Sequence, residues 1–187
     1  MTLDDLAARG RVLLGCGKMG AAMLEGWLSG GLPASSVWVV DPQPSEWVQA
    51  QGIHINADLP TDPAIVLVAV KPQKMGDALP SMQALGNRAT VFLSVAAGTT
   101  IAHFENVLGA QTPIVRAMPN TPAAVGKGIT ALLGNAYVSD AQLALADELL
   151  QAVGQTVRLE SEAQMDAVTG VSGSGPAYVF HLIETLA

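Results

Sequence analysis

Short apolar runs alternate with longer amphipathic stretches along most of this chain. The runs are continuous in hydrophobicity, as in strands that are buried on both faces of a sheet, and they cover 12–14, 37–40, 65–70, 91–95 and 114–116. The stretches between them predict helices over 18–29, 44–51, 73–85 and 99–108. This alternation predicts an α/β fold with a Rossmann-type, doubly wound and mostly parallel sheet.

Two further strands are expected after the fifth run, over 129–133 and 156–159, on either side of a helix over 140–153. Ser139 is a suitable N-cap for that helix, because its hydroxyl can accept from a free backbone N–H. Gly154 is a candidate residue to end it.

The pattern becomes purely helical after residue 160. We therefore expect a dinucleotide-binding domain over 1–160 and the beginning of an all-helical second domain over 161–187, which is cut at Ala187. Small hydroxyls, glycines and a proline in Val171–Tyr178 predict a new helix start there, with free N–H groups suited to an anion.

Composition narrows the class of protein. The 187 residues are 50% hydrophobic and suffice for one ordinary core. A net charge of −7 argues against nucleic acid or an anionic membrane as a partner. No apolar run approaches the roughly 20 residues of a membrane span, and the start, with Asp4 and Asp5, has no signal-peptide pattern. The single Cys16 fits a reducing compartment, so we expect a cytoplasmic protein.

A glycine-rich motif follows the first predicted strand and opens the first predicted helix. It reads Gly15-Cys16-Gly17-Lys18-Met19-Gly20. In this context its glycines allow a tight turn and close approach of a pyrophosphate to the backbone, at the positive end of the helix dipole. A glycine-rich turn without a ligand is the alternative, which the strand–motif–helix order disfavours.

Asp41 ends the second strand, 21 residues beyond Gly20. An acid at this place accepts hydrogen bonds from a ribose 2′-OH and repels a 2′-phosphate, which favours NAD over NADP. The alternative is a turn residue before Pro42.

Three further segments lie where later strands end, the edge at which open α/β sheets bind ligands. They are Ala69-Val70-Lys71-Pro72, Ala96-Ala97-Gly98 and the loop 116–122 that contains Asn120. Lysine can face coenzyme phosphates, and small side chains admit a nicotinamide ring. The alternative for the first segment is a solvated lysine, for the second a tight corner, and for the loop with Asn120 an Asx turn.

Acid–base and metal chemistry find little support in the sequence. His54, His103 and His181 are scattered without an orienting acid, and we interpret them as surface or satisfied residues. No metal-ligand spacing and no nucleophile elbow is present.

Taken in order, these segments resemble the Δ1-pyrroline-5-carboxylate reductase family of proline biosynthesis over about residues 11–187. The resemblance rests on Gly15–Gly20, Ala69–Pro72, Ala96–Gly98, Arg116–Pro122 and Asp166–Tyr178.

The resemblance implies hydride transfer from NADPH or NADH to the C=N carbon of 1-pyrroline-5-carboxylate, which gives L-proline. It implies coenzyme contacts in the first three segments and at Asp41 and Asn56, and places Glu162 close to the bound imino acid. It also implies a homodimer or larger homo-oligomer, formed through the second domain, and a substrate-carboxylate loop beyond Ala187. The family tends to prefer NADPH, against the electrostatics of Asp41.

Two other readings stay open. A β-hydroxyacid dehydrogenase shares this coenzyme half, but carries a lysine on the helix after the second-domain glycines, and 177–187 has none. The second alternative is a non-catalytic module that senses NAD(P).

Overall fold

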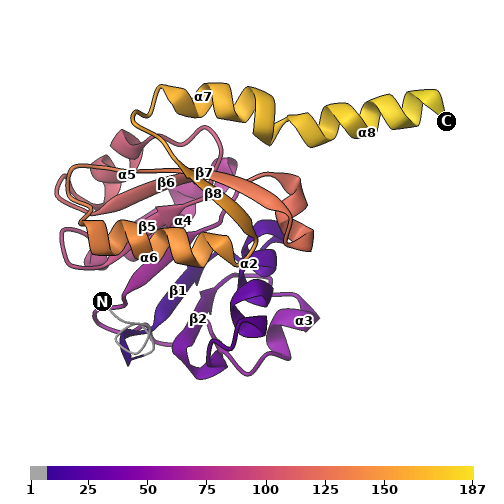
Figure 1. The fold of residues 1–187 in the computed structure, drawn as a ribbon. Coiled ribbons are helices and arrows are strands. Elements are labelled where there is room, and N and C mark those ends of the chain that lie inside the picture. Colours follow the sequence, from indigo (N-terminus) through magenta and orange to yellow (C-terminus); the bar gives the residue numbers. More distant parts are fainter. Residues whose placement is uncertain (1–7) are drawn as a thin grey trace.

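The computed structural model describes residues 8–187, so Asp4 and Asp5 lie outside the described residues. Eight strands form one sheet in the order β3-β2-β1-β4-β5-β6-β7-β8 (Figure 1). The strands are β1 Arg11–Leu14, β2 Val37–Val40, β3 His54–Ile55, β4 Ile65–Val68, β5 Val91–Ser94, β6 Ile114–Met118, β7 Gly128–Gly134 and β8 Gly154–Arg158.

Every neighbouring pair of strands is parallel except β6 and β7. The predicted mostly parallel sheet is therefore confirmed. The strand order reverses at β1, which lies between β2 and β4, and such a switch point is where open α/β sheets bind ligands. β3 was not predicted, because two residues are too short to show a period.

Seven α-helices occur in the described part of the chain. They are α2 Lys18–Ser29, α3 Glu46–Gln49, α4 Met75–Ala78, α5 Ile101–Leu108, α6 Asp140–Gln151, α7 Gln164–Val168 and α8 Gly175–Leu186. The helix predicted over 73–85 is instead one α-turn between two 3₁₀ segments. Pro80 lacks the N–H that a continuous helix needs there.

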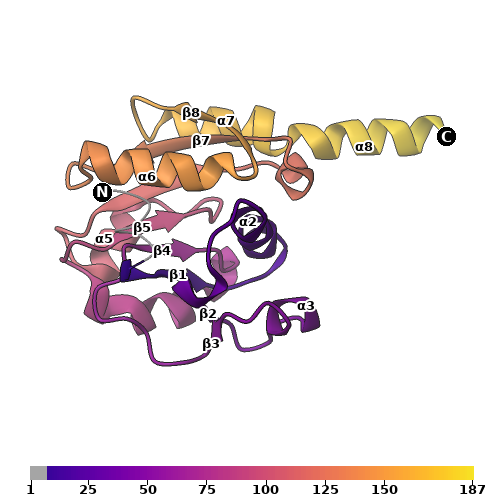
Figure 2. The same ribbon diagram turned by 60° about the horizontal axis from the view of Figure 1, so that its bottom comes forward.

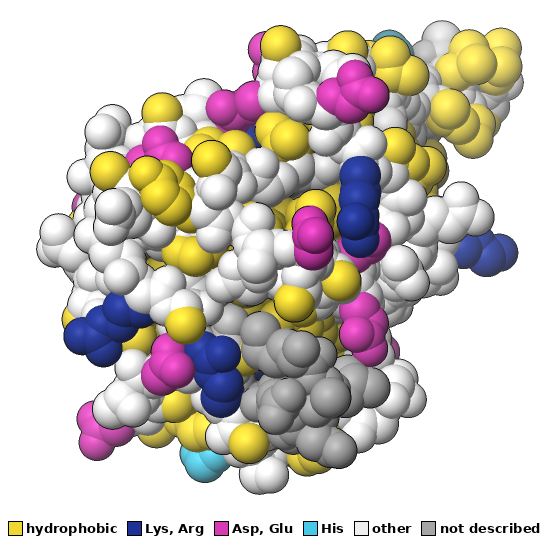
Figure 3. Space-filling model, turned by 60° about the vertical axis from the view of Figure 1, so that its left-hand side comes forward, with side chains coloured by type: hydrophobic (Ala, Val, Ile, Leu, Met, Phe, Trp, Pro, Cys, Tyr) yellow, Lys and Arg dark blue, Asp and Glu magenta, His cyan; other side chains and the backbone are white. Residues whose placement is uncertain are grey.

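Hydrophobic side chains form a core on each face of the sheet. Leu13 packs with α2 and α6, whereas its neighbours Val12 and Leu14 pack with α4 and α5 on the other face. Burial on both faces explains why the strands are continuous apolar runs. Figure 2 shows α6 lying along the sheet, and on the face drawn in Figure 3 basic and acidic side chains are interspersed.

The ends of α6 test two capping predictions. Ser139 is the N-cap, and its side chain and that of Gln142 form a capping box, so this prediction is confirmed. The prediction that Gly154 ends the helix is wrong, since α6 ends at Gln151 with Ala152 as C-cap. Gly154 begins β8 at φ +145°, where a Cβ would lie 2.0 Å from the carbonyl oxygen of Gly128 on β7.

The C-terminal segment is one bent helical rod. A π-turn over Thr169–Gly173 joins α7 to α8, and α8 extends away from the sheet (Figures 1 and 2). The helix start predicted within Val171–Tyr178 is confirmed, since α8 begins at Gly175 with a proline in its first turn. The free N–H groups expected there are not found, because the helical rod continues from α7 through the π-turn. The N–H of Ser174 donates to Thr169 O, and that of Ala177 donates to Ser174 O.

No helix among residues 8–187 combines the length and apolar character needed to cross a bilayer.

Candidate coenzyme-binding site

The glycine-rich motif forms the loop between β1 and α2. Gly15 has φ +85°, and a Cβ there would lie 2.7 Å from Val70 Cγ1. A Cβ on Gly20 would lie 2.7 Å from Gly15 O, so this glycine lets α2 start close to the loop. Gly17 faces open space and is the N-cap of α2, without a side-chain cap. The loop thus offers the uncapped N–H groups of a twelve-residue helix to an anion.

Asp41 holds this loop in place. Its Oδ2 accepts from the N–H of Cys16 at 2.7 Å, and its Oδ1 accepts from the N–H of Gln43 at 2.8 Å. The second bond makes Asp41 the turn residue that the alternative reading proposed, although it also holds the loop. Each carboxylate oxygen has two lone pairs, so a ribose hydroxyl can share the group with these backbone donors.

Asn56 in turn holds Asp41. Its amide nitrogen donates to Asp41 O at 2.9 Å, and its amide oxygen accepts from Asp41 N–H at 3.0 Å. Asn56 has φ +50°, a left-handed conformation that asparagine tolerates better than most residues. The side chain singled out as a coenzyme contact therefore also positions the acid. Only the family resemblance marked it in the sequence.

Cys16 is buried inside the loop, 6% exposed. Burial raises the pKa of its thiol to about 11, and the negative charge of Asp41 adds to the effect. The thiol is thus protonated at neutral pH and carries no nucleophilic chemistry.

A second group of predicted residues surrounds a hollow of about 330 Å³. Pro72, which follows exposed Lys71 at the end of β4, and Gly98, which follows β5, both line it. Ala96 is buried beside it in the chain, whereas Ala97 is exposed. His103 also lines the hollow, although the sequence gave no reason to select it. It lies in the first turn of α5, where its backbone N–H donates to the side chain of the N-cap Thr100.

Asn120 and Glu162 join the sheet to the C-terminal rod. Asn120 accepts from Ile129 N–H at 3.0 Å and donates to Ser172 Oγ at 3.3 Å. Glu162 Oε1 accepts from Ile101 N–H at 2.9 Å and from Nη1 of Arg116 at 2.6 Å. Sequence reasoning placed Arg116 only within a loop motif and did not pair it with this acid.

The predicted residues thus lie in three groups at the carboxyl edge of the parallel strands. Within residues 8–187, no three His, Cys, Asp or Glu side chains gather as metal ligands. His54 stacks on Trp38, with ring centroids 4.4 Å apart, and bonds Ser35 O, as expected of a satisfied residue. The arrangement suits a phosphate-bearing coenzyme, bound mainly by backbone groups.

Two family models match this chain. The NADP oxidoreductase model described as coenzyme F420-dependent matches residues 12–98, and the pyrroline-5-carboxylate reductase dimerisation model matches 162–187. The chain is 38% identical over 179 residues to pyrroline-5-carboxylate reductase of Pseudomonas aeruginosa, covering 92% of this chain and 66% of that protein. It is 30% identical to the solved reductase of Coxiella burnetii, with a TM-score of 0.88, covering 95% of this chain and 68% of that one.

The chain belongs to the pyrroline-5-carboxylate reductase family.

The predicted family is therefore confirmed, while the chain spans less than two thirds of the length of the Pseudomonas aeruginosa relative. The reductase of Plasmodium falciparum, solved with NADP bound, has a TM-score of 0.84 at 25% identity, covering 97% of this chain and 68% of that one. Prephenate dehydrogenases and imine reductases below 25% identity share the fold alone.

Proposed function

We propose that this chain is the coenzyme-binding part of an enzyme that transfers hydride from NADPH or NADH to the C=N carbon of 1-pyrroline-5-carboxylate, forming L-proline. One observation carries the proposal: a family member presents the open glycine loop and the uncapped start of α2 at the switch point of the sheet.

The predicted residues divide the coenzyme between them. We assign the pyrophosphate to the loop Gly15–Gly20 and the adenosine ribose to Asp41 and Asn56. We assign the nicotinamide end to Ala69–Pro72, Ala96–Gly98 and Asn120. Of these, Pro72 and Gly98 line the 330 Å³ hollow. This assignment follows from their common edge and from the open face of Gly17.

The reaction asks for position more than for acid–base groups. A protonated C=N carbon is already electrophilic and the hydride comes from the coenzyme, so the protein holds the two together and excludes water. We place Glu162 beside the imino acid. Its Oε1 is occupied by Arg116 and Ile101, which leaves Oε2 to accept from the substrate N–H.

We further propose a homodimer or a larger homo-oligomer, assembled through a second domain that starts near residue 161. The dimerisation model matches 162–187, and α8 has no buried residue. The substrate and L-proline are the small-molecule partners, and the single buried cysteine fits a cytoplasmic location.

Oxidation of NADH and NADPH that depends on 1-pyrroline-5-carboxylate tests the reaction. Turnover with formation of L-proline supports it, and a 3-hydroxy acid in place of the imine tests the hydroxyacid dehydrogenase reading. Coenzyme binding without turnover on either substrate would favour a sensing module. We expect the 187 residues alone to bind coenzyme and to turn over slowly, because the relatives are about half as long again.

A further inference from the structure

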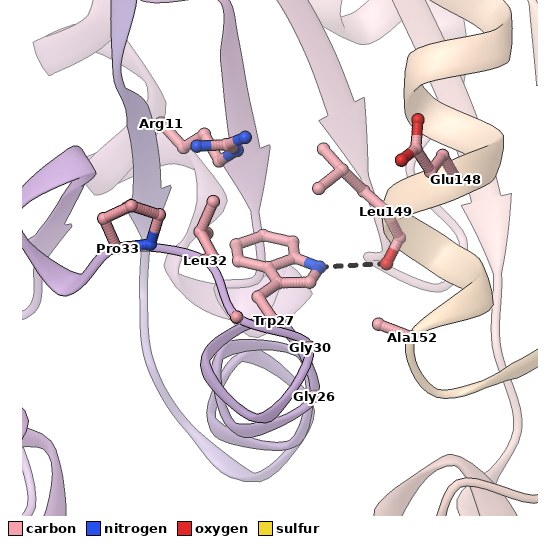
Figure 4. Close-up of a pocket in the computed structure, with 10 residues that line it drawn as sticks. Arg11, Gly26, Trp27, Gly30, Leu32, Pro33, Glu148, Leu149 and Ala152 are labelled. Carbon is pink, nitrogen blue, oxygen red and sulfur yellow. Dashed lines mark hydrogen bonds between the residues drawn. The ribbon is translucent and has the colours of Figure 1, made fainter. Parts of the chain in front are cut away.

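A hollow of about 420 Å³ lies at the opposite edge of the sheet from the coenzyme loop, within the size range of small-molecule sites. It opens between the C-terminal ends of α2 and α6, beside the first residue of β1 (Figure 4). We call it the α2–α6 hollow. The four residues of β1 separate its Arg11 from the coenzyme loop by about 13 Å. The hollow shares no residue with the proposed coenzyme site.

Arg11 has an unsatisfied charged group at this hollow. Its side chain is 1% exposed, and Nη1 donates to Ser36 Oγ at 3.2 Å. Nε has no hydrogen-bond partner among the described residues, and Arg11 forms no ion pair with them. A buried guanidinium N–H without an acceptor is costly, so a ligand atom that accepts from it is expected. Figure 4 shows the guanidinium facing the space between the two helices.

The other side of the hollow is negative. Glu148 lines it from α6. Burial lowers the pKa of Arg11, and the negative charge of Glu148 partly offsets this. The last turns of α2 and α6 contain no basic residue, so their C-terminal carbonyl groups keep their negative dipole ends. A simple anion would be repelled by this side, and a simple cation by Arg11.

Apolar side chains form the wall between the two charges. Trp27, Leu32 and Leu149 line it, and the indole Nε1 of Trp27 donates to Leu149 O at 2.9 Å (Figure 4). This bond fixes the ring, so the wall is formed before a ligand arrives, which limits the ordering cost of binding. The wall suits a short methylene chain.

We propose that the α2–α6 hollow binds a small amino acid whose carboxylate and ammonium groups are separated by a few methylenes. The carboxylate accepts from Nε of Arg11, and the ammonium group faces Glu148 and the two helix ends. The ligand carries one negative and one positive group, and the hollow offers Arg11 and Glu148 as their opposite charges. Each charged end of the ligand is therefore paired when it leaves water.

Calorimetric titration of the 187-residue chain with 4-aminobutyrate tests this site. This probe has no C=N bond and no ring, so its binding does not depend on the proposed reductase function. Butyrate and butylamine each carry one of its two charged ends. We expect both to bind at least about tenfold more weakly, since a hydrogen bond to a charged group is worth roughly that factor.

Three variants separate the two ends of the ligand. Arg11→Met should abolish binding, and Glu148→Gln should weaken 4-aminobutyrate to the level of butyrate. Asp140→Asn removes an exposed charge from the other end of α6 and should change nothing. Thermal unfolding confirms that each variant is folded.

Failure of the wild-type chain to bind 4-aminobutyrate would overturn the proposal, as would binding that Arg11→Met leaves unchanged. If Arg11→Met does not fold, Glu148→Gln still decides, because Glu148 is exposed and its loss does not threaten the core. Equal affinity of this variant and the wild type for 4-aminobutyrate also contradicts the site.

Discussion

Single side chains hold the coenzyme loop in shape. Asn56 exchanges two hydrogen bonds with the backbone of Asp41, and Asp41 fixes Cys16 within the loop. The acid therefore has a structural task besides the recognition of a ribose. Its removal is expected to change both stability and coenzyme preference.

Asp41→Asn should raise the affinity for NADPH relative to NADH by about tenfold, because the repulsion of a 2′-phosphate is removed. It should also lower the free energy of unfolding by about 1–2 kcal/mol, since the amide has only one acceptor oxygen for the two N–H donors of Cys16 and Gln43. Fluorescence titration with both coenzymes and urea unfolding measure the two effects. Asp140→Asn is the matched loss of charge. An unchanged coenzyme ratio would reduce Asp41 to a turn residue.

The reactivity of the Cys16 thiol at different pH values reports on the burial of the same loop. Its pKa is raised to about 11 by burial and by Asp41, so roughly one chain in ten thousand carries the thiolate at pH 7. A group with a raised folded pKa stabilises the fold below its unfolded pKa, and this stability is lost as pH rises towards 11. We expect slow labelling by a thiol reagent at pH 7 that accelerates up to about pH 11. In Asp41→Asn labelling should be faster, and fast labelling of the wild type at pH 7 would contradict the burial.

At the scale of helices and strands, the side chain of Glu162 connects three elements. It precedes α7, accepts from the first N–H of α5, and pairs with Arg116 on β6. Arg116 is 6% exposed and Glu162 33%. The pair is thus largely removed from water, so the loss of one partner leaves a poorly solvated charge.

Arg116→Met should lower the free energy of unfolding by about 2–3 kcal/mol. Arg158→Met is the comparison, because Arg158 pairs with Asp147 and is 52% exposed. The Asp147 side chain left behind is 16% exposed but still accepts from Gln151, so this change should cost only about 1 kcal/mol. Denaturant unfolding of both variants at pH 7 gives the comparison. If both variants lose the same free energy of unfolding, the pair of Arg116 and Glu162 contributes no more than a surface ion pair.

At the scale of the whole molecule, the helical rod exposes a broad apolar face. The large apolar side chains of α8 that are more than half exposed are Tyr178, Val179, Phe180, Leu182, Ile183 and Leu186. Exposed apolar surface of this extent is typical of an interface. The match of the dimerisation model to 162–187 points the same way.

The chain should therefore self-associate in solution, and Phe180→Glu should shift it towards the monomer by at least about tenfold in dissociation constant, since a charge would be buried in the contact. Sedimentation over a range of concentrations measures the shift. Val125→Glu alters a similarly exposed apolar side chain, 72% against 61% for Phe180, on the 121–125 turn and should leave association unchanged. A monomeric wild-type chain, with α8 still helical, would contradict the interface.

The sequence by itself determined what depends on a few neighbouring residues. Continuous apolar runs predicted five of the strands, because burial on both faces leaves its mark in each run. Two more strands were expected on either side of the helix over 140–153. The glycine spacing predicted the loop after β1, and Ser139 predicted the start of α6. Where this local reasoning failed, the cause was local too: Pro80 interrupted a helix, and Gly154 served a strand rather than a helix end.

Only the tertiary structure decided which groups meet. The bonds of Asp41 to Cys16, of Glu162 to Arg116 and of Glu162 to Ile101 join residues 25, 46 and 61 positions apart. The unsatisfied Arg11 and the hollow beside it likewise arise where β1 meets the ends of α2 and α6. Periodicity and turn chemistry act over about ten residues, whereas these contacts depend on how finished elements pack against one another.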